Sequence, residues 1–238
     1  MTTSNNRGRG RTTLVLAAAL VGLVAIAAVV VLILNLVQRP DPGPAPTSSP
    51  TESPAPTEPA DAESICGLEA GSAEVTSAPE TEWTVIGRTS VPNSATAGPG
   101  IIEPSGLRHC FAHSPEGALF AAASLVGAAI EGTNREEIAQ ELVAEGPGRT
   151  AAIAQASEPV DSQTFGMSIE GFRVLEYTAD AARIDLALRL TSGEYVSYVV
   201  DLRWEGGDWK LVLADDGSPL TAPVELQSAG GYLTWSSS

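Results

Sequence analysis

The sequence predicts an α+β domain behind a transmembrane helix, with about three helices packed in a curved antiparallel meander of about four to five strands. Three observations lead to this fold class. Residues 14–37 form one uncharged apolar run, residues 115–156 carry helix start signals, and residues 167–213 alternate apolar and polar positions between short turns. Because helices come first and the meander follows, we expect the most apolar helix to lie in the concavity of the sheet.

The first element is the apolar run, which we interpret as a single membrane-spanning anchor. At ~1.5 Å per residue, residues 14–37 make a helix of about 36 Å, enough to cross a hydrocarbon core of about 30 Å. A cleaved signal peptide is the alternative, since Ala25-Ile26-Ala27 has the form of a cleavage site, but cutting there leaves a long apolar N-terminus. The positive-inside rule places residues 1–13 in the cytoplasm and residues 40–238 outside, because three arginines precede the run and one follows it: Arg7, Arg9 and Arg11 against Arg39.

Charge and composition describe the chain beyond the anchor. The protein has 29 acidic and 13 basic residues, a net charge of −16. Only nine basic residues follow residue 39, against all 29 acidic ones, so this part lacks the clustered positive face that nucleic acid requires. Residues 38–64 hold eight of the 17 prolines and no aromatic residue, which is typical of an unfolded stalk with a maximum reach of about 84 Å.

The remaining residues, 65–238, are long enough for one domain with a core and contain both cysteines. Cys66 and Cys110 lie on the side assigned as external, where a disulfide is favoured over a metal pair because a closed zinc site needs four ligands. The bond would tie the first folded residues to the start of the first helix. Closing a loop of about 45 residues stabilises by roughly 3–4 kcal/mol in the chain-entropy model.

The domain begins with a weakly patterned stretch and then a strong helix start. Residues 67–108 are rich in Gly, Pro, Ser and Thr and predict coil, with one short strand at residues 83–86. Ser114 is a candidate N-cap, followed by a proline at the first helical position and an acid beside the positive helix end. Residues 118–130 are uncharged and apolar on nearly every face, which indicates a central helix covered on several sides.

Two smaller helices and the sheet follow. Thr133 and Glu136 form a capping box that predicts a surface helix, and a third helix spans about residues 149–156. In the strands, Ile184, Leu186, Leu188 and Leu190 face one way, whereas Arg183, Asp185 and Arg189 face the other, so the meander has one solvent-exposed face. The predicted strands are Met167–Tyr177, Ala182–Leu190, Glu194–Trp204 and Trp209–Leu213, with an edge strand at Tyr232–Trp235.

Two motifs resemble a known family. One is His113-Ser114-Pro115-Glu116-Gly117-Ala118, and the other is Arg203-Trp204-Glu205-Gly206-Gly207-Asp208-Trp209-Lys210-Leu211. They resemble actinobacterial single-pass membrane proteins that often accompany integrative and conjugative elements, and the likeness covers residues 83–217. It implies a cystatin-like cone of the nuclear transport factor two superfamily, the fold of type IV secretion scaffold subunits. It also implies an assembly or accessory role at the envelope, and no catalytic residue is carried over from it.

Candidate reactive groups are few. His109 and His113 have a spacing that would place two metal ligands on one helix face, but the expected helix starts after His113. No Asp or Glu lies between Pro104 and Pro115, so a third ligand would have to come from far away, and we expect no metal. Ser105, Ser114 and Ser124 lack a nucleophile-elbow context. Glu116 is either a pocket carboxylate or, as we prefer, a complement to the helix dipole.

The tryptophan hairpin has two interpretations. Trp204 and Trp209 form either an exposed interaction loop or a cross-strand pair against the core, with Gly206 and Gly207 supplying the positive φ of the turn; we favour the pair. Asp208 belongs to the same turn. Asp215-Asp216-Gly217 resembles a calcium-loop fragment, but it lacks the alternating oxygen ligands and is interpreted as a plain turn.

These patterns lead to one preferred hypothesis and two alternatives. We expect a non-enzymatic protein of the cell membrane whose external domain binds envelope proteins, a second copy of the chain being one candidate partner. The first alternative is a domain that binds a small ligand in the cone cavity, which convergent polar groups in that cavity would favour. The second is an enzyme of the same superfamily, which needs an inward-facing acid with a His or Tyr. No cofactor is expected.

Overall fold

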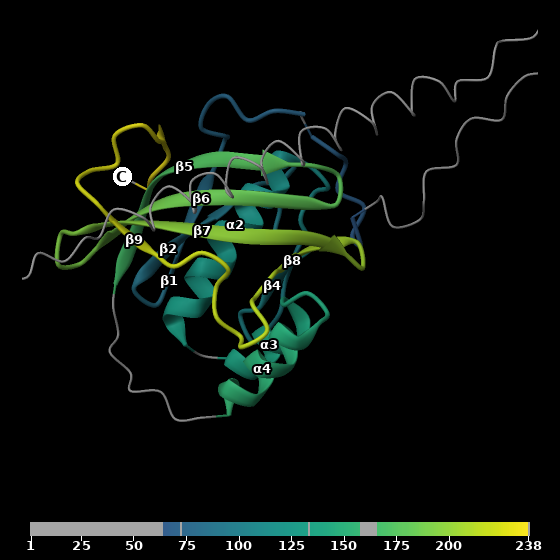
Figure 1. The fold of residues 1–238 in the computed structure, drawn as a ribbon. Coiled ribbons are helices and arrows are strands. Elements are labelled where there is room, and N and C mark those ends of the chain that lie inside the picture. Colours follow the sequence, from purple (N-terminus) through teal and green to yellow (C-terminus); the bar gives the residue numbers. More distant parts are fainter. Residues whose placement is uncertain (1–63, 72, 133, 158–165, 238) are drawn as a thin grey trace, which may run out of the picture. The chain divides into compact units, whose positions relative to one another are not determined.

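The computed structural model describes residues 64–71, 73–132, 134–157 and 166–237. The predicted anchor, residues 14–37, and nearly all of the predicted stalk, residues 38–64, lie outside the described residues. Within the described part, none of the helices combines the length and the apolar character needed to cross a bilayer. The folded part has three helices and a mostly antiparallel sheet, so the α+β class is confirmed (Figure 1).

The main sheet is an antiparallel meander extended by the C-terminal segment. Its order is β10-β5-β6-β7-β8, and β9 also pairs with β7. The alternation and the turn residues predicted the four central strands to within two residues at every boundary. The strands are β5 (Met167–Tyr177), β6 (Ala181–Leu190), β7 (Tyr195–Glu205), β8 (Asp208–Leu211), β9 (Val224–Leu226) and β10 (Leu233–Thr234).

Helix α2 (Pro115–Glu131) lies against one side of this sheet and forms the centre of the core (Figure 1). It begins as predicted, because the Ser114 side chain accepts a hydrogen bond from Gly117 N at 3.0 Å. Every residue from 117 to 127 is buried, since α2 contacts strands on both sides, β2 on one and β5 to β8 on the other. The prediction of a helix covered on several sides is confirmed.

The second helix begins one residue later than the capping box predicts. Helix α3 (Arg135–Glu141) has Asn134 at its N-cap, in the left-handed region with φ 59°, and no side-chain cap hydrogen bond. Instead, the Asn134 amide donates to the carbonyl oxygen of Ser105. A loop contact therefore replaces the local cap and shifts the helix start. Helix α4 (Pro147–Ala156) follows, two residues longer than predicted.

The stretch predicted as coil contains two small antiparallel pairs. Strand β1 (Glu82–Ile86) is the predicted short strand, and it pairs with β2 (Thr89–Asn93). Strand β3 (Ile101–Ile102) pairs with β4 (Arg108–His109). The coil prediction is wrong here, because segments of two to five residues are too short to show a period and are held by their pairing partners.

The solvent-exposed face expected for β6 is also corrected in part. Asp185 is only 1% exposed. The chain between β9 and β10 crosses from the β7 side of the sheet to the β5 side, and Tyr232 on this crossing donates to Asp185 Oδ2 at 2.8 Å. Ser197 Oγ and Arg173 also donate to this carboxylate, so its charge is compensated where the tail covers it. Arg183 and Arg189 remain exposed.

Candidate functional site

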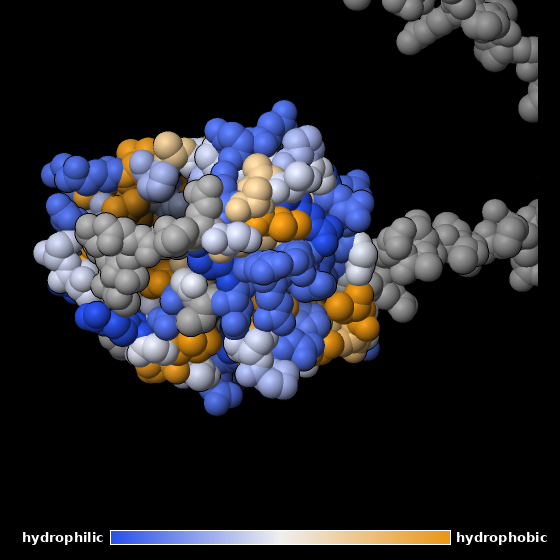
Figure 2. Space-filling model, turned by 90° about the horizontal axis from the view of Figure 1, so that it is seen from below, coloured by the Kyte–Doolittle hydropathy of each residue, from blue (hydrophilic) through white to orange (hydrophobic). Residues whose placement is uncertain are grey.

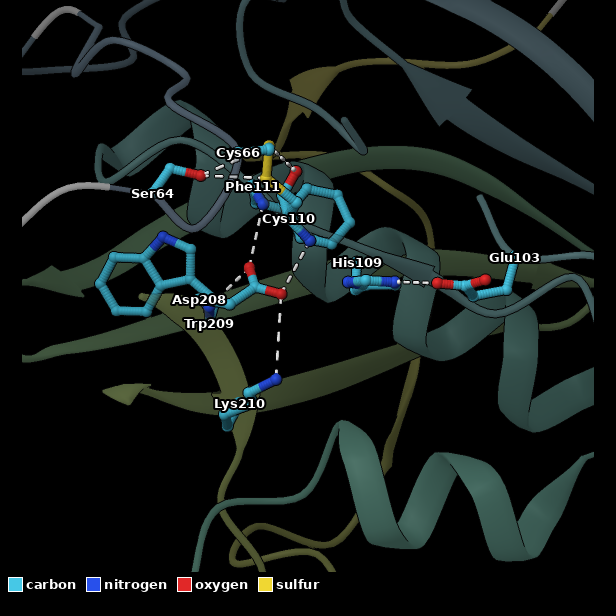
Figure 3. Close-up of a disulfide and its surroundings, with 9 residues drawn as sticks. All are labelled: Ser64, Cys66, Glu103, His109, Cys110, Phe111, Asp208, Trp209 and Lys210. Atoms are coloured by element: carbon cyan, nitrogen blue, oxygen red, sulfur yellow. Dashed lines mark hydrogen bonds and ion pairs between the residues drawn. A yellow bond between two sulfur atoms is a disulfide. The ribbon is translucent and has the colours of Figure 1, made fainter. Parts of the chain in front are cut away.

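The two motifs singled out in the sequence are in contact, since His113 stacks on Trp204. Beside them, Asp208 of the hairpin meets Cys110 and Phe111 at the disulfide (Figure 3). The segment from Cys110 to Ala118 precedes and starts α2, and the Trp204–Trp209 motif forms the β7–β8 hairpin. We call the region where they touch the motif junction. It is built from the side chains of His113, Trp204, Asp208 and Trp209, the backbone of residues 110–112, and the disulfide.

Asp208 is the polar centre of the motif junction. Its side chain is 0% exposed, and it accepts hydrogen bonds from three backbone N–H groups: Cys110 at 2.8 Å, Phe111 at 2.9 Å and Trp209 at 2.9 Å. Lys210 Nζ lies 3.9 Å from Asp208 Oδ2 (Figure 3). Burying a carboxylate is costly unless it is paired and hydrogen-bonded, and Asp208 meets this requirement. Its bonds to the N–H groups of Cys110 and Phe111 hold the segment before α2 against the hairpin.

Two aromatic contacts complete this attachment. Trp209, 1% exposed, donates through Nε1 to the carbonyl oxygen of Ala112 at 3.0 Å. Trp204 pairs with Trp209 across the strands with ring centroids 5.1 Å apart, the arrangement favoured from the sequence. The His113 ring stacks on Trp204 at 4.0 Å with an 8° interplanar angle and meets Trp209 edge-on at 5.8 Å. His113 therefore packs as part of the aromatic cluster.

The glycine of the first motif permits a close backbone approach. A Cβ placed on Gly117 would lie 2.0 Å from the carbonyl oxygen of Ala112, the same oxygen that accepts from Trp209. No heavy-atom contact of that length is tolerated, so the first turn of α2 sits against residue 112 only because residue 117 has no side chain.

We expect Gly117→Ala to lower the free energy of unfolding by about 1–3 kcal/mol, the usual cost of overpacking a core. The sign of this change distinguishes overpacking from helix propensity, because alanine in place of glycine inside a helix ordinarily raises the free energy of unfolding by about 1 kcal/mol. Chemical denaturation measures the change. Ala129→Gly, on an exposed position of α2, reports the ordinary propensity effect. A more stable Gly117→Ala protein would contradict the close approach.

The disulfide joins the start of the described chain to the motif junction. Cys66 and Cys110 are bonded as predicted, with Cα atoms 6.1 Å apart. The Ser64 hydroxyl lies 3.1 Å from Cys110 Sγ, and Ile65 N donates to the carbonyl oxygen of Gly207 at 3.0 Å. Gly206 and Gly207 have φ of 62° and 77°, the positive values predicted for the turn. The hairpin turn thus contacts the residues on which the predicted stalk ends.

We expect Cys66→Ser to lower the free energy of unfolding by roughly 3–4 kcal/mol, because the unfolded chain loses a crosslink that closes 44 residues of sequence separation. Cys66 is exposed, so the substitution leaves the core volume unchanged. Wild-type protein kept in reductant is the matched control and should lose the same amount. Equal stability of the oxidised and reduced proteins, or free thiols in mass spectrometry of the protein isolated without reductant, would count against the crosslink.

Glu205 closes the hairpin and links it to the α3–α4 connection. Burial acts to raise the pKa of its carboxyl, but the N–H of Glu145 at 2.9 Å and the guanidinium of Arg203 outweigh that effect and lower the pKa. Since the pKa in the folded state lies below the ordinary 4.5, Glu205 stabilises the fold above about pH 4.5, and this contribution is lost as the pH falls through the folded pKa.

Glu205→Gln should therefore flatten the dependence of unfolding free energy on pH below about 4.5, because the variant has no carboxyl to protonate. Urea denaturation at several acidic pH values measures that slope. Glu225→Gln, at an exposed residue of β9, should leave the slope close to wild type. Parallel pH profiles for the Glu205→Gln and wild-type proteins would refute the role of this carboxylate.

The remaining candidate residues lie apart from one another. His109, in β4, pairs with Glu103 at 2.9 Å, whereas His113 stacks on Trp204, and neither is on a helix. In residues 64–237, as far as they are described, no group of three His, Cys, Asp or Glu has the arrangement of a metal site. Ser105 donates to Glu137 at 3.0 Å and Ser124 is buried in α2.

Two acidic candidates have local explanations. Burial raises the pKa of Glu116, which lies in the first turn of α2, where an acid also complements the helix dipole. Asp216 accepts from the Ser218 hydroxyl at 2.6 Å and from Ser218 N at 2.9 Å, and these bonds lower its pKa. Both bonds close the turn at residues 215–217 on itself, as a plain turn requires.

The motif junction defines a class of protein: an α+β domain whose N-terminal segment is fastened by a disulfide to a tryptophan hairpin. Residues 45–234 match the model of a family described as a domain of unknown function (DUF8175). Because this match covers most of the chain, the chain belongs to that family. No curated protein and no solved structure matches it.

Proposed function

We propose that the protein is a membrane-anchored, extracytoplasmic interaction or scaffold module that catalyses no reaction. The observation that supports this proposal is the attachment of residues 64–66 to the motif junction. These residues follow the proline-rich segment directly, and all three contact the motif junction through Ser64, the Ile65 backbone and the Cys66 disulfide. A disulfide forms and persists in an oxidising compartment outside the cytoplasm. Because the bond joins Cys66 to Cys110, a force applied through the stalk would pass through the bond and bypass residues 67–109.

The interior of the domain supports a contact role over ligand binding beneath the central helix. The side chains between α2 and the sheet are apolar and buried, among them Leu119, Phe120, Phe172, Ile184 and Leu186. A site for a small ligand needs a cavity with convergent polar groups, and this space is filled by Leu, Ile, Phe and Ala side chains. The surface is therefore the better place to look for recognition.

The exposed apolar side chains are spread over the surface. Figure 2 shows hydrophobic groups separated by hydrophilic ones on the face it presents. Scattered groups of this kind fit a mixed, accessory interface better than one large obligate interface. The large exposed apolar residues are Ile65, Val85, Ile102, Leu175, Leu220, Val224 and Leu233.

The family resemblance supports a more specific version of the proposal. A helix packed on an antiparallel meander is what a cystatin-like cone requires, and the two motifs that carry the resemblance are in contact. On this basis we propose an accessory role at the envelope, in a conjugation or secretion apparatus of an actinobacterium.

Crosslinking in intact cells tests the proposed function. A photoreactive amino acid placed at Val85 or Val224, both more than half exposed, should capture envelope proteins identified by mass spectrometry. The same variants kept in the dark serve as the matched control and should capture none. If the exposed positions capture no envelope protein while the purified protein binds a metabolite, the small-ligand alternative replaces the interaction role.

A further inference from the structure

A small pocket lies beside the C-terminal end of α2, away from the motif junction. Its walls are apolar, with Ile86 of β1, Leu107 before β4, Ala128 of α2 and Ile138 of α3 among the lining residues. Its volume is about 60 Å³. A water-sized group needs about 10–15 Å³, so the pocket holds roughly four or five such groups. It therefore has room for a branched side chain of four carbons, such as leucine, but not for an aromatic ring.

Most polar groups of the lining are bound to other parts of the protein. The Asn134 amide donates to the carbonyl oxygen of Ser105, and Ser105 Oγ donates to Glu137 Oε1 at 3.0 Å. Arg108 is 5% exposed and directs its Nη2 to Asn93 Oδ1. A site for a free small ligand needs several convergent polar groups. This pocket instead offers apolar walls, which suit an apolar side chain carried by a larger partner.

Glu131 gives the pocket a negative charge. It is the last residue of α2 and is partly exposed, and its Oε1 accepts a hydrogen bond from Arg88 N at 3.1 Å. A carboxylate has about four acceptor positions, so this bond leaves room for others. Among the described residues, no cationic group lies within ion-pair distance of Glu131 or of Glu137. A lysine or arginine of a partner would therefore meet an acid that has no internal counter-ion.

We propose that this pocket receives a branched apolar side chain of a partner protein, and that Glu131 binds a lysine or arginine beside that side chain. The inference rests on the proposed interaction role and adds the chemistry of the partner segment. A basic segment suits a protein with a net charge of −16. Exposed apolar side chains adjoin the lining in β1 and β3, where Val85 is 71% exposed and Ile102, opposite Arg108, is 54% exposed.

The experiment uses the full chain in nonionic detergent micelles with ¹³C-labelled isoleucine methyl groups. The signals of Ile86 and Ile138 are assigned by their loss in Ile86→Val and Ile138→Val. The probe is the capped peptide acetyl-Gly-Lys-Leu-Lys-Gly-amide, and we expect it to shift both signals saturably at millimolar concentration. The same peptide with alanine or phenylalanine in place of leucine should bind at least about tenfold more weakly, because alanine leaves the pocket unfilled and phenylalanine exceeds its volume.

Two substitutions test the apolar and the charged contact separately. Ala128→Leu fills the pocket and should weaken binding at least about tenfold, while the other isoleucine signals report that the variant is folded. Glu131→Gln keeps an oxygen that can accept from Arg88 N. It should weaken binding several-fold and remove the preference for this peptide over one with glutamate in place of both lysines. Glu136→Gln, at an exposed position of α3 outside the lining, is the matched control and should bind like wild type.

Capture in intact cells distinguishes failure of this proposal from failure of the proposed function. With the photoreactive group at Val85, Ala128→Leu should reduce capture, whereas capture from Val224 in β9 should persist. Failure of both positions to capture a protein refutes the interaction role. Capture that Ala128→Leu leaves unchanged refutes the pocket alone. No saturable shift with the lysine peptide, equal binding of the glutamate peptide, or a shift unchanged in Ala128→Leu also overturns the proposal. So do shifts of the same signals on dilution of the protein alone, which would assign the pocket to a second copy.

Discussion

Replacing Asp208 by alanine is expected to lower the free energy of unfolding by about 4–5 kcal/mol, one of the two largest effects expected from a single substitution in this protein. The carboxylate is fully buried and accepts from the N–H groups of Cys110, Phe111 and Trp209. Alanine leaves these donors without their acceptor inside the protein, and it removes the ion partner of Lys210. Because α2 starts a few residues after Cys110 and Phe111, we expect the loss of these hydrogen bonds to destabilise the whole domain and not the hairpin alone.

A graded series distinguishes this role from a general intolerance of the turn. Asp208→Asn keeps one side-chain oxygen, which can still accept from Phe111 and Trp209, but its NH₂ group faces the N–H of Cys110. It should cost about half as much as alanine. Asp215→Ala, in an exposed turn, should change stability by less than about 0.5 kcal/mol. Urea denaturation monitored by tryptophan fluorescence measures all three, and similar values for Asp208→Ala and Asp215→Ala would refute the assignment.

The elements that were predicted well have local signals. The alternation from Met167 to Tyr177 and the Gly206-Gly207 turn are encoded by neighbouring residues, and the structure has the strand and the turn at those positions. The same holds for the start of α2, where the cap at Ser114 depends on residues three positions apart. Local chemistry of this kind can be read without knowing the rest of the fold.

The features that were missed depend on distant partners. Asp208 belongs to a recognised turn, but the N–H groups it binds lie 97 and 98 positions earlier in the chain. Asp185 alternates like a solvent-exposed residue and is buried because Tyr232 crosses over it, 47 positions later. A single sequence contains no local signal for such pairings.

The C-terminal segment was expected to contribute only an edge strand, and its Trp235 supplies a further part of the core. Strand β10 does pair with β5, and the next residue turns inward. Trp235 is 3% exposed, with its ring centroid 5.2 Å from that of Trp83, 5.3 Å from Phe120 and 5.5 Å from Phe172. Its Nε1 donates to Thr81 Oγ1 at 2.8 Å. This one side chain therefore connects β1, α2 and β5.

We expect Trp235→Ala to cost about 4–5 kcal/mol, at the upper end of the range for large-to-small core substitutions, because the cavity adjoins three separate elements that cannot all collapse into it. Trp235→Phe keeps most of the ring contacts and loses the hydrogen bond to Thr81, so it should cost about 1–2 kcal/mol. Leu233→Ala, two residues earlier at a 37% exposed position, should cost much less than either. Chemical denaturation of the three variants orders them. If Trp235→Ala proved as mild as Leu233→Ala, the tail would be a surface strand only, and the core would be closed by β1, α2 and β5 without it.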